Sequence, residues 1–77
     1  MEQSNYNDRD ILTILGNRIR LCRLSRHMTQ SDLSLKTGIA CYYISRIETG
    51  QLNIGINMLY KLAKGLKVHI SELVQDL

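Results

Sequence analysis

The sequence contains no proline, phenylalanine or tryptophan, and its only aromatic side chains are four tyrosines. Valine occurs only twice, whereas leucine occurs 12 times and isoleucine nine times. A leucine-rich, proline-free chain with so little valine favours short packed helices over strands. With 77 residues, of which 44% are hydrophobic and 22% charged, the composition predicts one small all-α globular domain.

Long apolar runs are also missing, since no stretch approaches 18 uninterrupted apolar residues, and we therefore expect no membrane-spanning helix. The first ten residues are polar and include three acids, which excludes a signal peptide and a transit peptide. Two cysteines, Cys22 and Cys41, are too few for a disulfide framework or a four-cysteine zinc site. A reducing cytoplasmic location is the expectation.

Catalytic and metal-binding patterns are absent as well. His27 and His69 fall on different predicted elements, and neither has the Cys, His or carboxylate spacing of a metal site. No set of nucleophile, base and orienting residue is visible, and short helices offer no deep pocket. We expect no enzyme, no metal, no cofactor and no small-molecule ligand.

Positive charge is concentrated in the middle of the chain. The net charge is −2 over residues 1–17, +6 over residues 18–64 and −1 over residues 65–77. A basic centre between acidic ends favours an anionic partner such as DNA, although a solvated surface slightly rich in arginine would look the same.

Hydrophobic spacing predicts a flexible tail over residues 1–9 and a domain of five short helices over residues 10–77. The first helix is expected to be capped by Asp8 or Asp10 and to end between residues 26 and 28. Its buried face combines spacings of four, four and three, at Ile11, Leu15, Ile19 and Cys22.

Two very short helices follow. Thr29 and Asp32 form a capping-box pattern that begins a helix over residues 30–37, and Gly38 ends it. The next helix covers residues 41–48 and ends before Gly50. Two short helices joined by three residues that include a glycine are typical of a helix-turn-helix.

The fourth helix is predicted over residues 56–64, with Gly65 as its stop. Its apolar positions are Ile56, Leu59, Leu62, Ala63 and Leu66. A last short helix has an apolar stripe longer than one core needs, at Ile70, Leu73, Val74 and Leu77. We expect a homodimer seam here, because large exposed apolar surfaces mark interaction sites. Its candidate residues are Met58, Tyr60, Ile70, Val74 and Leu77.

On a helical wheel of residues 41–48, Ile44 and Ile47 face the core, while Tyr42 and Arg46 lie roughly opposite. A polar helix face of this size fits the major groove of DNA, where arginine pairs bidentately with guanine. A simply solvated face would carry the same residues. The candidate base-reading residues are Cys41, Tyr42, Ser45 and Arg46.

Phosphate contacts are expected at two places. The free N–H groups at the start of the second helix suit a phosphate, and the side chains of Thr29 and Gln30 stand there. Backbone N–H groups over residues 50–53 could hold another phosphate, whereas Tyr43 fits either phosphate contact or edge packing. The candidate phosphate-binding residues are Thr29, Gln30, Tyr43, Thr49, Gln51 and Asn53.

Several segments together resemble the Cro/C1-type (phage-repressor-like) helix-turn-helix family over about residues 14–74. They are Leu15-Gly16-Asn17-Arg18-Ile19-Arg20, Met28-Thr29-Gln30-Ser31-Asp32-Leu33, Lys36-Thr37-Gly38-Ile39, Tyr43-Ile44-Ser45-Arg46-Ile47-Glu48-Thr49-Gly50 and Leu62-Ala63-Lys64-Gly65-Leu66-Lys67-Val68. The resemblance implies base reading by Cys41, Tyr42 and Arg46, and phosphate contact by Gln30 and Tyr43. It also implies a buried ion pair between Arg23 and Glu48.

Some positions depart from the family pattern. Ala40 replaces the usual Ser or Thr cap of the third helix, and Cys41 is an unusual base reader that leaves the preferred DNA sequence open. A thiol at a helix start could also sense oxidants. Residues 53–55, Asn-Ile-Gly, resemble the controller proteins of restriction–modification systems.

The sequence therefore predicts a sequence-specific DNA-binding transcriptional regulator that binds double-stranded DNA, at a two-fold operator, as a homodimer. An autoregulatory controller of a restriction–modification operon is the narrower form of this prediction. The alternative is an antitoxin or protein-interaction module that uses the same helical domain on a protein partner.

Overall fold

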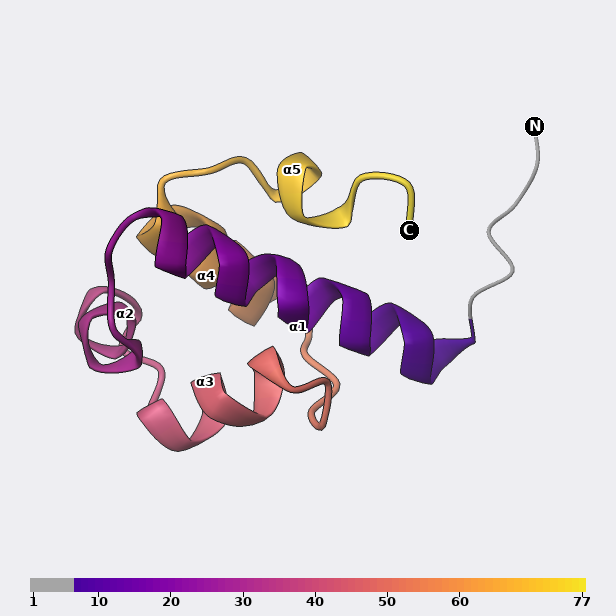
Figure 1. Cartoon of the computed structure of the whole chain (residues 1–77), viewed down its shortest axis with the longest axis horizontal. Coiled ribbons are helices and arrows are strands. Elements are labelled where there is room, and N and C mark those ends of the chain that lie inside the picture. Colours follow the sequence, from indigo (N-terminus) through magenta and orange to yellow (C-terminus); the bar gives the residue numbers. More distant parts are fainter. Residues whose placement is uncertain (1–6) are drawn as a thin grey trace.

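The computed structural model describes residues 7–77 and contains five helices over that part of the chain (Figure 1). They are α1 (Asp8–Ser25), α2 (Gln30–Thr37), α3 (Cys41–Glu48), α4 (Ile56–Leu66) and α5 (Ile70–Val74). Residues 7–77 include no strand, which confirms the predicted all-α class. None of their helices is long and apolar enough to cross a membrane.

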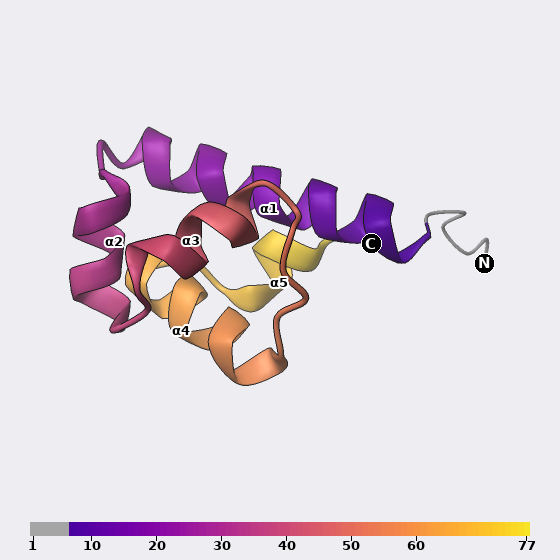
Figure 2. The same cartoon turned by 90° about the horizontal axis from the view of Figure 1, so that it is seen from below.

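The helices surround one core, with α1 lying along the long axis of the molecule (Figure 1). α3 packs against α1, α2 packs against both α3 and α4, and α5 closes the core against α1 and α4. Figure 2 shows α2 and α3 as two short helices joined by a tight turn. The fully buried side chains at the centre are Ile19, Leu33, Ile44, Leu62 and Leu66.

The start of α1 differs from the prediction. Asn7, not Asp8 or Asp10, is the N-cap, and its Oδ1 accepts a hydrogen bond from the N–H of Asp10 over 2.8 Å. Asp8 and Asp10 occupy the first turn, where their charges favour the positive end of the helix dipole. Residues 8 and 9 are therefore helical rather than part of the predicted tail, of which residues 1–6 lie outside the described chain.

α2 and α3 begin and end where the sequence predicts. Thr29 Oγ1 accepts from the N–H of Asp32 over 3.0 Å, and Asp32 Oδ2 accepts from the N–H of Thr29 over 2.8 Å, which completes the capping box. The latter bond holds the pKa of Asp32 below its ordinary value. Gly38 and Gly50 end the two helices with φ values of 76° and 74°, a region that glycine enters cheaply.

The predicted stop of α4 at Gly65 is wrong, because the helix continues through Gly65 to Leu66. The left-handed residue that ends it is Lys67, with φ of 59°. Gly65 serves close packing between helices instead. A Cβ atom at this position would lie 2.6 Å from Cγ2 of Thr37, so a larger side chain would push α2 and α4 apart.

Several large apolar side chains are exposed, and the two most exposed lie on α2 and α4. Ile56, expected on the buried stripe of α4, is 67% exposed, and Leu35 on α2 is 86% exposed. The remaining apolar positions predicted for α4 are buried, since Leu59, Leu62 and Leu66 are each at most 6% exposed.

Candidate nucleic-acid interface

The inner face of α3 is fixed closely against α1. Ile44 and Ile47 are buried, as the helical wheel predicted. Gly16 of α1 allows the two backbones to meet, because a Cβ atom there would collide with the carbonyl oxygen of Ile47. The orientation of α3 is therefore set by backbone packing as well as by its apolar side chains.

A buried ion pair adds a polar connection between the same two helices. Arg23 Nε donates to Glu48 Oε2 over 2.7 Å, and Arg23 Nη2 donates to Glu48 Oε1 over 3.0 Å. Arg23 Nη1 also donates to the carbonyl oxygen of Met28 over 2.7 Å. The hydrogen bond to Glu48 raises the pKa of Arg23 above its ordinary value. The bidentate geometry and the third bond compensate for burial of both charges.

Glu48 also holds Gln30, the first residue of α2. Gln30 Nε2 donates to Glu48 Oε1 over 3.1 Å, so one carboxylate oxygen receives bonds from both α1 and α2. The Gln30 side chain is half-buried and keeps a second amide hydrogen for another acceptor. We call the side chains of Arg23, Glu48 and Gln30 the clamp network. It presents a fixed donor beside the free N–H groups at the start of α2.

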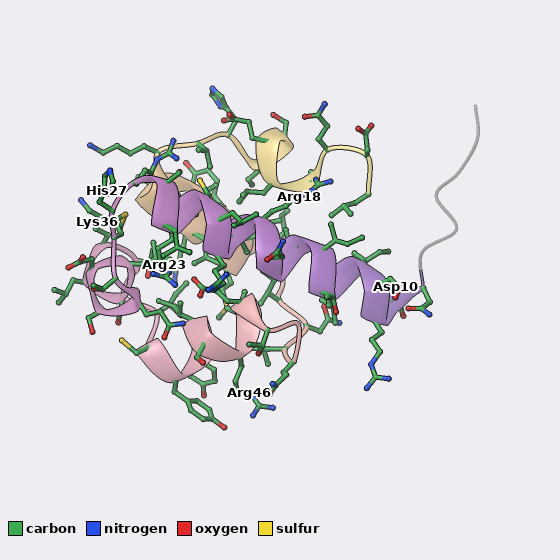
Figure 3. The ribbon with its side chains drawn as sticks, in the orientation of Figure 1. Asp10, Arg18, Arg23, His27, Lys36 and Arg46 are labelled. Carbon is green, nitrogen blue, oxygen red and sulfur yellow. The ribbon has the colours of Figure 1, made fainter. Side chains whose placement is uncertain are left out.

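The outer face of α3 carries a different pair. The guanidinium carbon of Arg46 lies 5.5 Å from the centre of the Tyr42 ring, and Arg46 Nη1 donates a long hydrogen bond of 3.4 Å to the Tyr42 hydroxyl. The rings of Tyr42 and Tyr43 meet edge to face, with centroids 5.6 Å apart. Figure 3 shows Arg46 projecting outward from α3, on the side away from α1. Ring stacking thus limits the directions in which the guanidinium extends.

Cys41 and Ser45 complete this outer face. Ser45 is exposed, and Cys41 is half-buried at the first position of α3. The Cys41 thiol lies 3.7 Å from the hydroxyl oxygen of Ser31 on α2. Ser31 is exposed, and the sequence analysis did not include it among the candidate DNA-contacting residues. Its position next to Gln30 was the one feature of the sequence that pointed to such a role. We call the side chains Cys41, Tyr42, Ser45 and Arg46 the outer face of α3.

The two threonines predicted to bind phosphate differ in whether their hydroxyl hydrogen is free to donate. Thr29 Oγ1 accepts from the capping N–H, so its own hydroxyl hydrogen remains available. The hydroxyl of Thr49 donates instead to the carbonyl oxygens of Ser45 and Arg46, over 3.0 and 3.2 Å. A phosphate oxygen accepts but does not donate, and Thr49 would have to break these bonds to reach it.

Two of the backbone N–H groups over residues 50–53, the stretch predicted to hold a phosphate, already have partners within the chain. The N–H of Gly50 donates to the carbonyl oxygen of Ile47 over 3.1 Å, and that of Gln51 donates to the carbonyl oxygen of Arg46 over 2.8 Å. These bonds end α3 around the left-handed glycine. Gln51 and Asn53 are exposed and can still present their side-chain amides. Tyr43, in the first turn of α3 beside Tyr42, is 47% exposed.

The residues predicted for a dimer seam fall into two groups. Tyr60 is 58% exposed, whereas Met58, Ile70, Val74 and Leu77 are half-buried and pack on the edge of the core. Ile56, one turn before Tyr60, is a further exposed apolar side chain on α4 that the sequence assigned to the core. Among residues 7–77, no three His, Cys, Asp or Glu side chains are placed to hold a metal ion.

A family model described as helix-turn-helix matches residues 19–73. The Control protein C.BamHI of Bacillus amyloliquefaciens is 32% identical over 66 residues, which cover 84% of this chain and 82% of that protein.

Two solved structures are similar in both sequence and fold. The restriction–modification controller protein C.AhdI of Aeromonas hydrophila is 31% identical with a TM-score of 0.79, covering 80% of this chain and 94% of that chain. The controller protein C.Esp1396I, solved as a tetramer with its natural 35 base-pair operator, is 33% identical with a TM-score of 0.74. That match covers 84% of this chain and 96% of the other.

Proposed function

This chain belongs to the helix-turn-helix family and is a transcriptional regulator related to restriction–modification controller proteins, and we propose that α3 reads its operator in the major groove. The observation that carries the proposal is the contrast across α3. Its inner face is bonded to α1 and α2 by the clamp network, while Arg46 and Tyr42 extend outward together. A rigid helix with free donors on one face is what base reading requires.

Arg46 is the base reader with the largest expected contribution. Its guanidinium presents two parallel donors that match the O6 and N7 acceptors of guanine. Tyr42 limits its orientation, so that less conformational entropy is lost on binding than for an unsupported arginine. The smaller side chains Cys41 and Ser45 lie on the same face and suit contacts with neighbouring base edges.

Phosphate contacts set the register of α3 on the duplex. Gln30 supplies a side-chain amide that Glu48 already orients, beside the unpaired N–H groups of the first turn of α2. Thr29 adds a hydroxyl hydrogen, and the exposed side chains of Tyr43, Gln51 and Asn53 provide further donors nearby. Such contacts carry orientation and salt dependence rather than sequence information.

We also propose that two copies bind together on a two-fold operator, with half-sites about one helical turn apart. Exposed apolar side chains on α4, Ile56 and Tyr60, support an interface continuous with the half-buried stripe of α5. Tyr60→Asp and Val74→Asp are expected to produce monomers at concentrations where the wild type is dimeric. The measurement is light scattering after gel filtration, with Ser71→Asp as the control on the exposed side of α5. Dimers of both Asp variants would contradict this interface.

The relatives named as controller proteins favour an autoregulator of a restriction–modification operon that works in the cytoplasm, where its DNA is. No catalytic step is part of this proposal. Control would follow from protein concentration, because dimerisation and site occupancy both rise with it.

A gel shift with DNA from upstream of the protein's own gene, repeated at several salt concentrations, tests the proposed function. We expect a discrete complex that survives competitor DNA and weakens steeply with salt. Smeared, competitor-sensitive binding to every tested DNA would contradict it. That result would favour the alternative, an antitoxin-like protein-interaction module, and a pull-down would then search for the protein partner.

A further inference from the structure

All four lysines of the chain line one groove, which lies between α2 and α4. The groove has a volume of about 400 Å³, and its walls are formed by Lys36, Thr37, Lys61, Lys64, Gly65 and Lys67. The six arginines of the chain all lie elsewhere. We call this feature the lysine groove. Lys61, Lys64 and Lys67 follow one another at a spacing of three residues in and just after α4, and Lys36 joins them from α2, a helix distant in sequence.

Close packing of α2 on α4 brings these charges together. Gly65 lies against the end of α2, where an added Cβ atom would be 2.6 Å from Cγ2 of Thr37 and 3.7 Å from Cβ of Lys36. The absence of a side chain at residue 65 therefore brings Lys36 alongside the lysines of α4. Lys67 adds the last charge from the left-handed residue that ends α4.

The lysine groove holds positive charge that the rest of the described chain neutralises only in part. Within residues 7–77, the only ion pair joins Arg23 to Glu48. Asp32 lies one turn before Lys36, and its carboxylate, which also accepts the N–H of Thr29, offsets part of the charge of Lys36 alone. Four like charges in one groove repel one another, and a polyanion would relieve that repulsion.

Helix dipoles explain only part of this arrangement. Lys36 and Lys64 occupy last turns, where a cation stabilises the helix by a small amount. Lys61 stands in the middle of α4, where this benefit is lost. A purely structural role therefore predicts an effect on stability, whereas a binding role predicts an effect on salt-dependent association.

The lysine groove is separate from the outer face of α3. Lys36 stands about 9 Å along α2 from Gln30, given a rise of about 1.5 Å per residue. In Figure 3, Lys36 lies at the α2 end of the molecule, while Arg46 projects from α3 on another side. A straight duplex placed against α3 meets the start of α2, which is the end remote from the lysine groove.

The lining of the groove favours a phosphodiester backbone over a protein surface. Protein interfaces are enriched in arginine and aromatic side chains and depleted in lysine, and this groove is lined by no arginine and no aromatic residue. Lysine ammonium groups bind phosphate as point charges and impose no bidentate geometry.

We propose that the lysine groove is a second DNA-binding surface, which holds the phosphodiester backbone of DNA outside the segment that α3 reads. The inference rests on the proposed function, since that makes DNA the polyanion the protein meets. The phosphates belong either to flanking sequence on the same duplex or to a second duplex. In the second case the protein joins two separate DNA molecules.

The test compares the wild type with a Lys61→Gln, Lys64→Gln, Lys67→Gln variant and a matched Arg9→Gln, Arg20→Gln, Arg26→Gln variant, whose exposed arginines lie outside the groove. The flanking-DNA arm measures affinity against salt on random-sequence duplexes of about 20 and about 60 base pairs. The second-duplex arm measures capture of a labelled random-sequence duplex on beads that carry another duplex. Random sequence keeps both arms readable even if no specific operator exists, so failure of the proposed function is a separate result.

Each phosphate contact contributes about 0.9 to the slope of log affinity against log salt. If the groove binds flanking DNA, the slope of the lysine variant should be smaller by up to about 3 on the longer duplex only. If the groove binds a second duplex, the lysine variant should no longer capture the labelled duplex. Loss in the first arm assigns flanking DNA, and loss in the second assigns a separate duplex. Replacing the same lysines with arginine is expected to restore binding. Losses no larger than those of the arginine control, or a lower melting temperature with unchanged binding in both arms, would overturn the proposal.

Discussion

The two faces of α3 differ in how many of their polar atoms are already bonded. On the inner face, Glu48 receives three hydrogen bonds from two neighbouring helices. On the outer face, Arg46 has one long bond and a ring contact, both to Tyr42. One helix of eight residues thus has two distinct faces. The polar atoms of the inner face are already bonded and fix the position of the helix, whereas the donors of the outer face remain available for a ligand.

Breaking the inner face is expected to have the largest effect. Glu48→Ala leaves Arg23 buried without its counter-charge, so the free energy of unfolding should fall by about 3–5 kcal/mol. That loss is a large part of the stability of a small domain. Urea unfolding followed by circular dichroism measures it.

A paired variant separates the lost charge from the lost packing. Arg23→Met combined with Glu48→Leu removes both charges and keeps apolar volume, and most of the stability should return. A loss below about 1 kcal/mol in Glu48→Ala alone would contradict the role assigned to the clamp network.

Changing the outer face should leave the fold intact and reduce binding. Arg46→Ala is expected to weaken specific DNA binding by about 1–3 kcal/mol per half-site, because a bidentate guanine contact is lost. Tyr42→Phe keeps the ring beside Arg46 and should cost less. Gel shifts on specific and random DNA measure both variants. Equal weakening on the two DNAs by Arg46→Ala would show that Arg46 contacts phosphate instead of a base.

A substitution at the start of α3 is expected to stabilise the helix without changing either face. Ala40 precedes the helix and supplies no side-chain cap. Ala40→Ser should raise the free energy of unfolding by about 1 kcal/mol, since a serine hydroxyl can accept from a free N–H of the first turn. Thermal unfolding measures the gain, and an unchanged melting temperature would show that the local backbone cannot accommodate the cap.

The smallest expected effect concerns pH. The pKa of Asp32 is lowered by the Thr29 N–H, so its contribution to stability is present above the ordinary pKa and is lost as pH falls through the lower folded value. Asp32→Asn keeps an acceptor without the charge. The variant should therefore lose less stability than the wild type between about pH 5 and about pH 2, as measured by urea midpoints. Parallel pH profiles would contradict this assignment.

The sequence predicted α2 and α3 correctly because their signals are local. The Thr29–Asp32 capping box, Gly38 and Gly50 each act within one turn of the residues they define. The apolar spacing of Ile44 and Ile47 likewise identifies the inner face of α3 without knowledge of its neighbours.

The errors arose where distant segments decide the outcome. Gly65 looks like a helix stop in sequence, but Thr37 of α2 packs against it and α4 continues past it. Ile56 fits the apolar spacing of α4, yet no other element covers it.

We propose that the outer face of α3 reads bases through Arg46 while the inner face only holds the helix in place. Methylation interference at guanine N7 tests it most directly, because N7 methylation blocks a bidentate arginine contact. On DNA from upstream of the protein's own gene, we expect interference at guanines related by two-fold symmetry for the wild type, and none at those guanines for Arg46→Ala. Interference that persists in the variant, or no interference in the wild type, would contradict the claim.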